Sequence, residues 1–224
     1  MQVLYLHGFA SSPQSSKALL FAKRFAERQI RFDAPDLNAP DFSTLTVTRM
    51  LAAAGTIIEA AAAPVVVIGS SLGGFVAIHA AHRYADRVRA VVLLAPALDV
   101  DLTKGGPSAG GAADRRRFGE LGLAAWHSSN RLDVFHYGYG KMMPVHYELY
   151  TDAARYNALD VRLAQPVQVF QGRRDTAVDP AAVEQWASAR SNVELHLLDD
   201  DHQLHGSLEY IWTEMDRFLH QQMP

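Results

Sequence analysis

The sequence predicts an α/β fold in three layers, with helices on both faces of a six-stranded, mainly parallel sheet. Short runs rich in β-branched residues alternate with helical patterns along the chain, as expected for β–α–β units. The runs "VVVI" at 65–68 and "VVLL" at 91–94 show no alternation of polarity, which indicates strands buried on both faces. The expected strands cover residues 3–6, 31–34, 65–69, 88–94, 167–171 and 193–198, and the expected helices cover 16–28, 44–62, 72–84, 181–189 and 207–222.

The elements follow one another with recognisable boundaries. The first strand lies in "QVLYLHG", and the third runs directly into the helical pattern "LGGFVAIHAAHRY". The fifth strand, "VQVFQG", precedes a helix whose start has Asp179 as N-cap and Pro180 at the first helical position. The last helix has an apolar face with the spacing of an amphipathic helix. Its members are Leu208, Ile211, Trp212, Met215, Phe218 and Leu219.

The interval from Pro96 to Gln165 is too long for a loop inside a compact domain. It holds a glycine-rich patch, the helical stretch "RRRFGELGLAAW" and the aromatic stretch "LDVFHYGYGKMMPVHYELY". We therefore predict one domain over residues 1–224, with residues 97–160 as a small cap inserted after the fourth strand.

Composition excludes several classes of function. The 224 residues are 49% hydrophobic and 20% charged, with a net charge of -3, and the longest basic run is Arg115 to Arg117. A nucleic-acid or anionic-membrane surface is therefore not expected. The absence of cysteine excludes disulfides, a thiol nucleophile and thiolate metal sites. The chain shows no leader peptide and no apolar segment of membrane-spanning length, so we expect a cytoplasmic protein.

No cofactor is expected from the sequence. No glycine-rich phosphate-binding motif follows any predicted strand. The acidic run Asp199 to Asp201 beside His202 has the composition of a metal site, but a contiguous carboxylate run is more often a solvated loop, and no second ligand cluster has suitable spacing. We predict no metal.

The pattern G-x-S-x-G occurs twice, around Ser71 and around Ser108. Serine is a weak nucleophile unless its hydroxyl is exposed and next to a base. A strand that turns sharply into a helix exposes one residue at the turn, and glycines two positions before and after it relieve the crowding there. Ser71 has this strand–turn–helix context, whereas no strand precedes Ser108. We predict Ser71 as the nucleophile, with the backbone N–H of Leu72 as one donor to an oxyanion.

Four stretches together resemble an α/β-hydrolase: "LYLHGFASSPQSSKA", "VIGSSLGGFVA", "VFQGRRDTAV" and "LLDDDHQLHGSLEYIWTEMDRFL". The spacing is most similar to the small YqiA-like bacterial esterases, over nearly the whole chain. The resemblance implies a sheet without the first two strands of the larger family members. It implies Asp175 as the acid of a catalytic triad, with Asp179 as the alternative, and the N–H of Phe9 as the second oxyanion donor.

The resemblance also places the base shortly after the last strand, where His202 and His205 are both candidates and His202 matches the position better. We expect a serine esterase that cleaves a small carboxylic ester through an acyl-enzyme. Thioester hydrolysis, acyl transfer and a non-catalytic binding role remain alternatives. The aromatic residues of the predicted cap either line the acyl pocket or form the cap's own core. They are Trp126, Phe135, Tyr137, Tyr139 and Tyr147.

Overall fold

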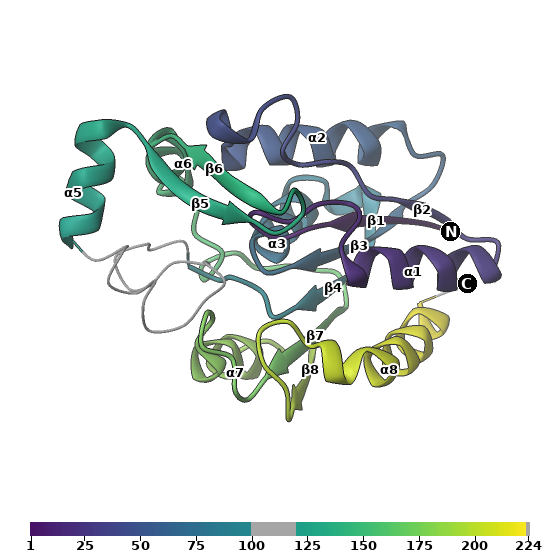
Figure 1. Ribbon diagram of the computed structural model, residues 1–224. Coiled ribbons are helices and arrows are strands. Elements are labelled where there is room, and N and C mark those ends of the chain that lie inside the picture. The colour runs from purple at the N-terminus through teal and green to yellow at the C-terminus, as the bar shows by residue number, and fades with distance from the viewer. Residues whose placement is uncertain (100–119, 223–224) are drawn as a thin grey trace.

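The computed structural model describes residues 1–99 and 120–222 and contains the predicted six-stranded sheet (Figure 1). The strand order is β2-β1-β3-β4-β7-β8, and every neighbouring pair is parallel. The prediction of a six-stranded parallel sheet is therefore confirmed. The strands are β1 (Gln2–Leu6), β2 (Arg31–Asp33), β3 (Val65–Ser70), β4 (Val88–Leu94), β7 (Val167–Gly172) and β8 (Val193–Leu198).

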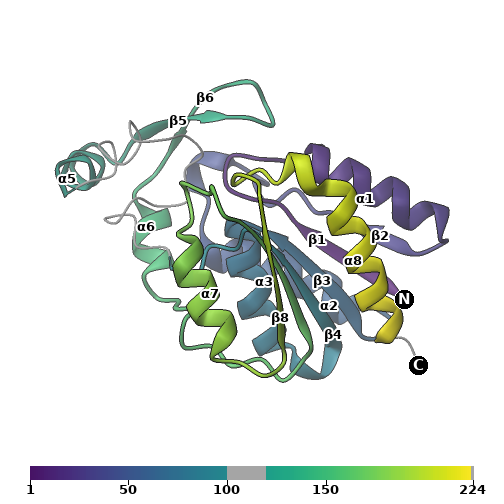
Figure 2. The ribbon, with the colours of Figure 1, turned by 90° about the horizontal axis from the view of Figure 1, so that it is seen from below.

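Helices cover both faces of the sheet (Figure 2). On one face lie α1 (Ser16–Glu27) and α8 (Leu208–Gln221), and on the other lie α2 (Val47–Ala60), α3 (Leu72–Arg83) and α7 (Pro180–Ser188). The strands supply both cores by alternation, since Val65 and Val67 pack with α2, α3 and α7 whereas Val66 and Ile68 pack with α1 and α8. Short 3₁₀ turns span Phe42–Thr44, Ala85–Arg87 and His205–Ser207.

The boundaries differ from the prediction mainly at α2. The helical pattern begins at residue 44 in the sequence, but the helix starts at Val47 because Thr46 is its N-cap and accepts a hydrogen bond from the N–H of Arg49 at 3.1 Å. The N-cap predicted at Asp179 is confirmed, since its side chain accepts from the N–H of Ala181 at 3.0 Å.

Between β4 and β7 the described residues form α5 (Glu120–Ser129), a β-hairpin of β5 (Leu132–His136) and β6 (Lys141–Val145), and α6 (Glu148–Ala153). The sequence indicated only an aromatic stretch where the hairpin lies. The hairpin extends beyond the carboxyl ends of the parallel strands (Figure 2). Its turn is bonded to the loops after β1 and β2, through Gly138 N–H to the Ala10 carbonyl at 3.4 Å and the Tyr139 hydroxyl to Asp36 at 3.2 Å. This position brings the hairpin close to the end of β3.

None of the helices in the described ranges has the length and hydropathy that a membrane span requires.

Candidate active site

Ser71 lies at a sharp turn between β3 and α3. Its φ is 53° and its ψ is −118°, a backbone conformation that residues other than glycine rarely adopt and that surrounding contacts must maintain. The N–H of Ser71 donates to the Leu94 carbonyl of β4 at 2.9 Å, and the carbonyl of Ser71 accepts from Ala97 at 3.1 Å. These bonds fix the turn to the neighbouring strand. The second serine with the same motif, Ser108, lies outside the described residues.

The two glycines around Ser71 allow the backbone segments to approach closely. A Cβ on Gly69 would lie 2.4 Å from the Gly73 carbonyl oxygen, and one on Gly73 would lie 2.1 Å from the carbonyl oxygen of Leu6. Both obstacles are backbone atoms, which cannot rotate away. The turn that exposes Ser71 therefore requires glycine at both positions, as the sequence pattern suggested.

We expect Gly73→Ala to lower the free energy of unfolding by about 2–4 kcal/mol, because α3 must move away from β1. Urea denaturation at equilibrium measures the change. Gly206→Ala is the matched control, since its added Cβ would come no closer than 3.3 Å, to a carboxylate oxygen of Asp200. Equal stability of the two variants would contradict the requirement for glycine at position 73.

Three side chains predicted from the sequence lie in a hydrogen-bonded chain. His202 Nε2 lies 3.0 Å from the Oγ of Ser71, and His202 Nδ1 lies 2.8 Å from Oδ2 of Asp175. Asp175 is acceptor-only when ionised, so Nδ1 carries the hydrogen and Nε2 is free to accept the hydroxyl hydrogen of Ser71. The alternative residues lie elsewhere: Asp179 caps α7, and His205 contacts the hydroxyl of Ser16 at 2.9 Å.

The carboxylate of Asp175 is buried and fully hydrogen-bonded. Besides His202, it accepts from the side-chain amide of Gln171 at 2.9 Å and from the N–H groups of Ala177 and Val178 at 2.8 and 2.9 Å. Burial raises the pKa of Asp175, but the hydrogen bond and charge of His202, with the other donors, outweigh it and hold the pKa below its usual value. Asp175 is therefore an anion at neutral pH that orients the imidazole.

Two backbone amides lie near Ser71 without an acceptor among the described residues: those of Leu72, the first residue of α3, and of Phe9. Gly8 brings the Phe9 loop close, because a Cβ on Gly8 would be 3.3 Å from the Cβ of Ser71. His7, whose side-chain role the sequence did not indicate, fixes the peptide that joins Gly8 to Phe9. Its Nε2 accepts from Leu37 at 3.0 Å, so Nδ1 donates to the Gly8 carbonyl at 2.9 Å. The Phe9 N–H, trans to that carbonyl, then points away from His7.

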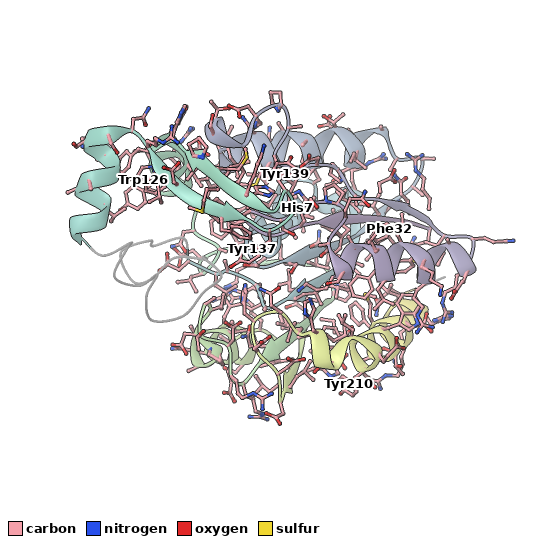
Figure 3. All side chains as sticks on the ribbon, viewed as in Figure 1. His7, Phe32, Trp126, Tyr137, Tyr139 and Tyr210 are labelled. Atoms are coloured by element: carbon pink, nitrogen blue, oxygen red, sulfur yellow. The ribbon has the colours of Figure 1, made fainter. Side chains whose placement is uncertain are left out.

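A cavity of about 750 Å³ opens beside Ser71 and His202. Of the aromatic residues proposed for substrate contact, Tyr137 lines it, whereas Trp126 and Phe135 do not. Trp126 is buried, donates to the Val145 carbonyl at 2.9 Å and packs edge-on against Tyr147. It forms part of the core under the hairpin, and Phe135 lies on the surface with 46% exposure. Figure 3 shows Trp126 at α5, the helix to which it belongs, and Tyr137 nearer the centre of the molecule.

Lys17, in the first turn of α1, has a buried ammonium group at the edge of the cavity. Its Nζ donates to the carbonyl of Gln203 at 2.7 Å and so ties the residue after His202 to α1. Burial lowers the pKa of Lys17 to about 8, against the opposing charges of Asp201, Asp200 and Asp175. The sequence contained no signal for this contact, because a lysine in the first turn of a helix is ordinarily solvated.

The lowered pKa of Lys17 predicts how stability depends on pH. The folded protein releases this proton near pH 8, whereas the unfolded chain retains it to about pH 10.4, so the stability linked to Lys17 rises with pH across this interval and is lost as pH falls through about 8. Relative to Lys17→Met, wild type should gain about 2 kcal/mol in free energy of unfolding between about pH 7 and about pH 9.5. Urea titrations at both values test this, and a constant difference would contradict it.

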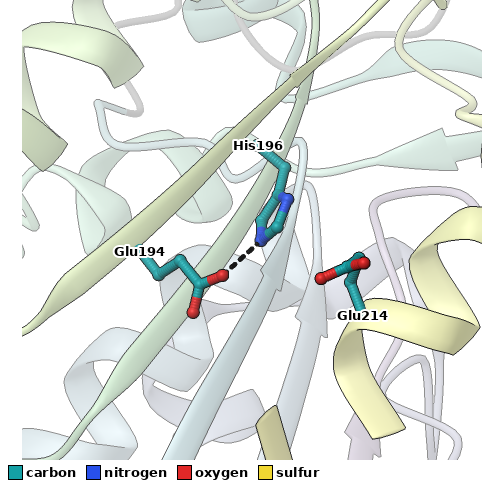
Figure 4. Close-up of side chains that lie close together, drawn as sticks. All are labelled: Glu194, His196 and Glu214. Atoms are coloured by element: carbon teal, nitrogen blue, oxygen red, sulfur yellow. Dashed lines mark hydrogen bonds and ion pairs between the residues drawn. The ribbon is translucent and has the colours of Figure 1, made fainter. Parts of the chain in front are cut away.

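One group of side chains has the composition of a metal site, away from Ser71. Glu194, His196 and Glu214 lie within 4.8 Å of one another between β8 and α8 (Figure 4). His196 Nε2 is 2.9 Å from Glu194, and Arg217 forms ion pairs with both glutamates. The guanidinium therefore already bonds to both carboxylates that a cation would need and offsets one of their two negative charges. The acidic run at Asp199 to Asp201 is not part of this group.

These features define an α/β-hydrolase fold, and comparison with solved structures agrees. Est1E from Butyrivibrio proteoclasticus with ferulic acid bound has a TM-score of 0.80 at 18% identity, covering 99% of this chain and 88% of that chain. Mouse alpha/beta hydrolase domain-containing protein 10 has 0.77 at 19%, covering 99% and 90%. The monoacylglycerol lipase of Paleococcus ferrophilus has 0.75 at 15%, covering 99% and 95%. At these identities the likeness shows the fold.

Within this class, the chain belongs to the Uncharacterised protein family (UPF0227), whose profile matches residues 2–219. This is the YqiA-like family that the sequence resembles, so that resemblance is confirmed. No protein with a curated description matches the chain in sequence.

Proposed function

We propose that this protein is a serine esterase that hydrolyses a small carboxylic ester through an acyl-enzyme. The observation that carries the proposal is the continuous hydrogen-bonded chain from Ser71 through His202 to the buried carboxylate of Asp175. A structural role accounts poorly for this arrangement, because Ser71 is held in a strained conformation at the edge of a cavity. Strain and an aligned base are what a serine nucleophile needs.

The first half of the reaction forms the acyl-enzyme. Ser71 Oγ attacks the ester carbonyl carbon while its proton passes to Nε2 of His202, and Asp175 stabilises the resulting imidazolium. The carbonyl oxygen becomes an oxyanion, which the N–H groups of Leu72 and Phe9 stabilise. The tetrahedral intermediate then expels the alkoxide, which takes the proton from Nε2 and leaves as the alcohol.

The second half returns the enzyme. A water molecule attacks the acyl-enzyme carbonyl, its proton passes to Nε2 of His202, and the second tetrahedral intermediate collapses to release the carboxylic acid. The proton returns to Ser71 Oγ as the ester bond to the serine breaks. The proton transfers use only Ser71 and His202, and the side chains of Ser71, His202 and Asp175 form one hydrogen-bonded chain.

Covalent labelling tests the proposal directly. A fluorophosphonate probe should modify the protein stoichiometrically, and mass spectrometry of the peptides should locate the adduct on Ser71. The labelled protein should lose its activity on p-nitrophenyl acetate. Acyl-CoA substrates in the same assay test thioester hydrolysis, the alternative that uses the same residues. The proposal would be refuted if the protein neither reacts with the probe nor hydrolyses p-nitrophenyl acetate or any of the acyl-CoA substrates.

A further inference from the structure

The serine-rich segment after the Phe9 loop forms one wall of the cavity beside Ser71. This segment covers residues 11–17, and six of its seven residues line the cavity. Gln203 and His205, which follow His202 in the sequence, also line it. Apart from Phe9, Ala177 and the rings of Tyr5 and Tyr137, the side chains around the cavity carry hydroxyl, amide, charged or imidazole groups or are glycines. The lining residues of the segment are Ser11, Ser12, Gln14, Ser15, Ser16 and Lys17.

Several of these polar groups have bonding capacity that the protein does not use. The side chains of Ser11, Gln14 and Thr176 form no hydrogen bond to any residue in the described part of the chain. Ser16 and His205 bond to each other at an exposed position, which leaves them accessible to a ligand. An alkyl chain in this space would displace water from these groups without replacing its hydrogen bonds, and that loss opposes binding. A hydroxylated ligand would restore the bonds.

The charges around the cavity argue against an anionic ligand. The ammonium of Lys17 lies close to three carboxylates, those of Asp175, Asp200 and Asp201. Its positive charge is therefore already compensated, and one of its hydrogens is bonded to the Gln203 carbonyl. A phosphate or carboxylate would meet no excess of positive charge here, whereas an uncharged polar group is not repelled by the neighbouring carboxylates.

The position of His202 indicates which part of an ester this wall would contact. The imidazolium must deliver its proton to the leaving oxygen, so the alcohol part of the substrate lies on the His202 side of Ser71. The neighbours of His202 in the cavity lining, Gln203 and His205, belong to the polar wall, and His205 connects it to Ser16. The wall is thus on the leaving-group side.

We propose that the alcohol part of the substrate is polyhydroxylated, so that the protein acts on uncharged acyl esters of a polyol or sugar. This inference rests on the proposed esterase function and deepens it. In this arrangement Gln14, Ser16 and His205 hydrogen-bond to the free hydroxyls of the leaving alcohol while His202 protonates its ester oxygen.

The test compares two esters with the same acyl group and the same number of carbons in the alcohol: glycerol 1-acetate and propyl acetate. After correction for their rates of hydrolysis by hydroxide, kcat/KM should favour glycerol 1-acetate by about tenfold or more, because a site built for hydroxyls discriminates against the analogue that lacks them. Gln14→Leu and Ser16→Ala should each reduce this preference at least about threefold. Ser188→Ala, a serine of α7 bonded to the Gln185 carbonyl, should leave the preference unchanged.

Equal kcat/KM for the two esters, with intact hydrolysis of p-nitrophenyl acetate and labelling of Ser71, would overturn this inference and leave the esterase function standing. A preference that survives both wall variants would also overturn it, since the wall would then not be its source. Failure to hydrolyse any ester together with an unlabelled Ser71 would instead remove the esterase function and the inference with it.

Discussion

Ser71→Ala should lower kcat/KM for p-nitrophenyl acetate by about 10³-fold or more, because no other group can form the acyl-enzyme. The methyl group of alanine occupies space that the serine already fills, so the turn between β3 and α3 should be retained. Circular dichroism and the urea midpoint check that the variant is folded. Steady-state kinetics on one short-chain ester measure the loss.

The duplicated motif provides the control for this experiment. Ser108 has the same glycine spacing, but the sequence predicts no strand before it, so Ser108→Ala should stay within a few-fold of wild type. A fully active Ser71→Ala protein would disprove the assignment of the nucleophile. Activity lost in Ser108→Ala alone would transfer that assignment to the second motif.

His202→Ala should produce a loss of similar size, about 10³-fold, because Ser71 then has no acceptor for its proton. The double variant with Ser71→Ala should be no worse than either single variant, since the two residues act in the same step. Fully additive losses would show that Ser71 and His202 do not work together. The measurement is kcat/KM for p-nitrophenyl acetate in all three variants.

Asp175→Asn should lose at least about 10²-fold in kcat although it preserves the shape of the side chain. The amide can donate to Nδ1 of His202, which moves the imidazole hydrogen to Nε2 and removes the acceptor for Ser71. Asp179→Asn is the matched control, because asparagine also caps helices and α7 should persist. An inactive Asp179→Asn beside an active Asp175→Asn would reverse the assignment of the acid.

Local patterns in the sequence predicted most of the sheet and the position of the candidate nucleophile, Ser71. The strand β3, the turn at Ser71 and the helix α3 are contiguous, so unbroken hydrophobicity and the glycine spacing sufficed to locate all three. The final helix was equally clear, because its apolar face is continuous over four turns. The hairpin of β5 and β6 was missed: Pro144 and the turn Tyr137 to Gly140 interrupt the pattern, and its stability depends on contacts with the loops after β1 and β2.

The choice between rival site residues depended on contacts between distant segments. His202 and His205 both follow β8 closely, and only the folded chain directs the first toward Ser71 and the second toward Ser16. Trp126 and Tyr137 occur in one aromatic-rich interval, yet one is buried under the hairpin and the other borders the cavity.

The sequence by itself therefore determined the order of the candidate catalytic residues along the chain: a serine at a strand–helix turn, followed by an acid and a base after two later strands. The serine could be recognised because Gly69, Ser71 and Gly73 are a few positions apart, where backbone geometry controls what a side chain can do. The resemblance favoured Asp175 and His202 over Asp179 and His205, and the tertiary structure shows that these two are the ones that face Ser71. The tertiary structure alone revealed how His7 orients the Phe9 amide and how Lys17 is buried against the loop of His202. Each of these is a contact between segments brought together by the parallel sheet, and side-chain direction across such a distance is not encoded in local sequence.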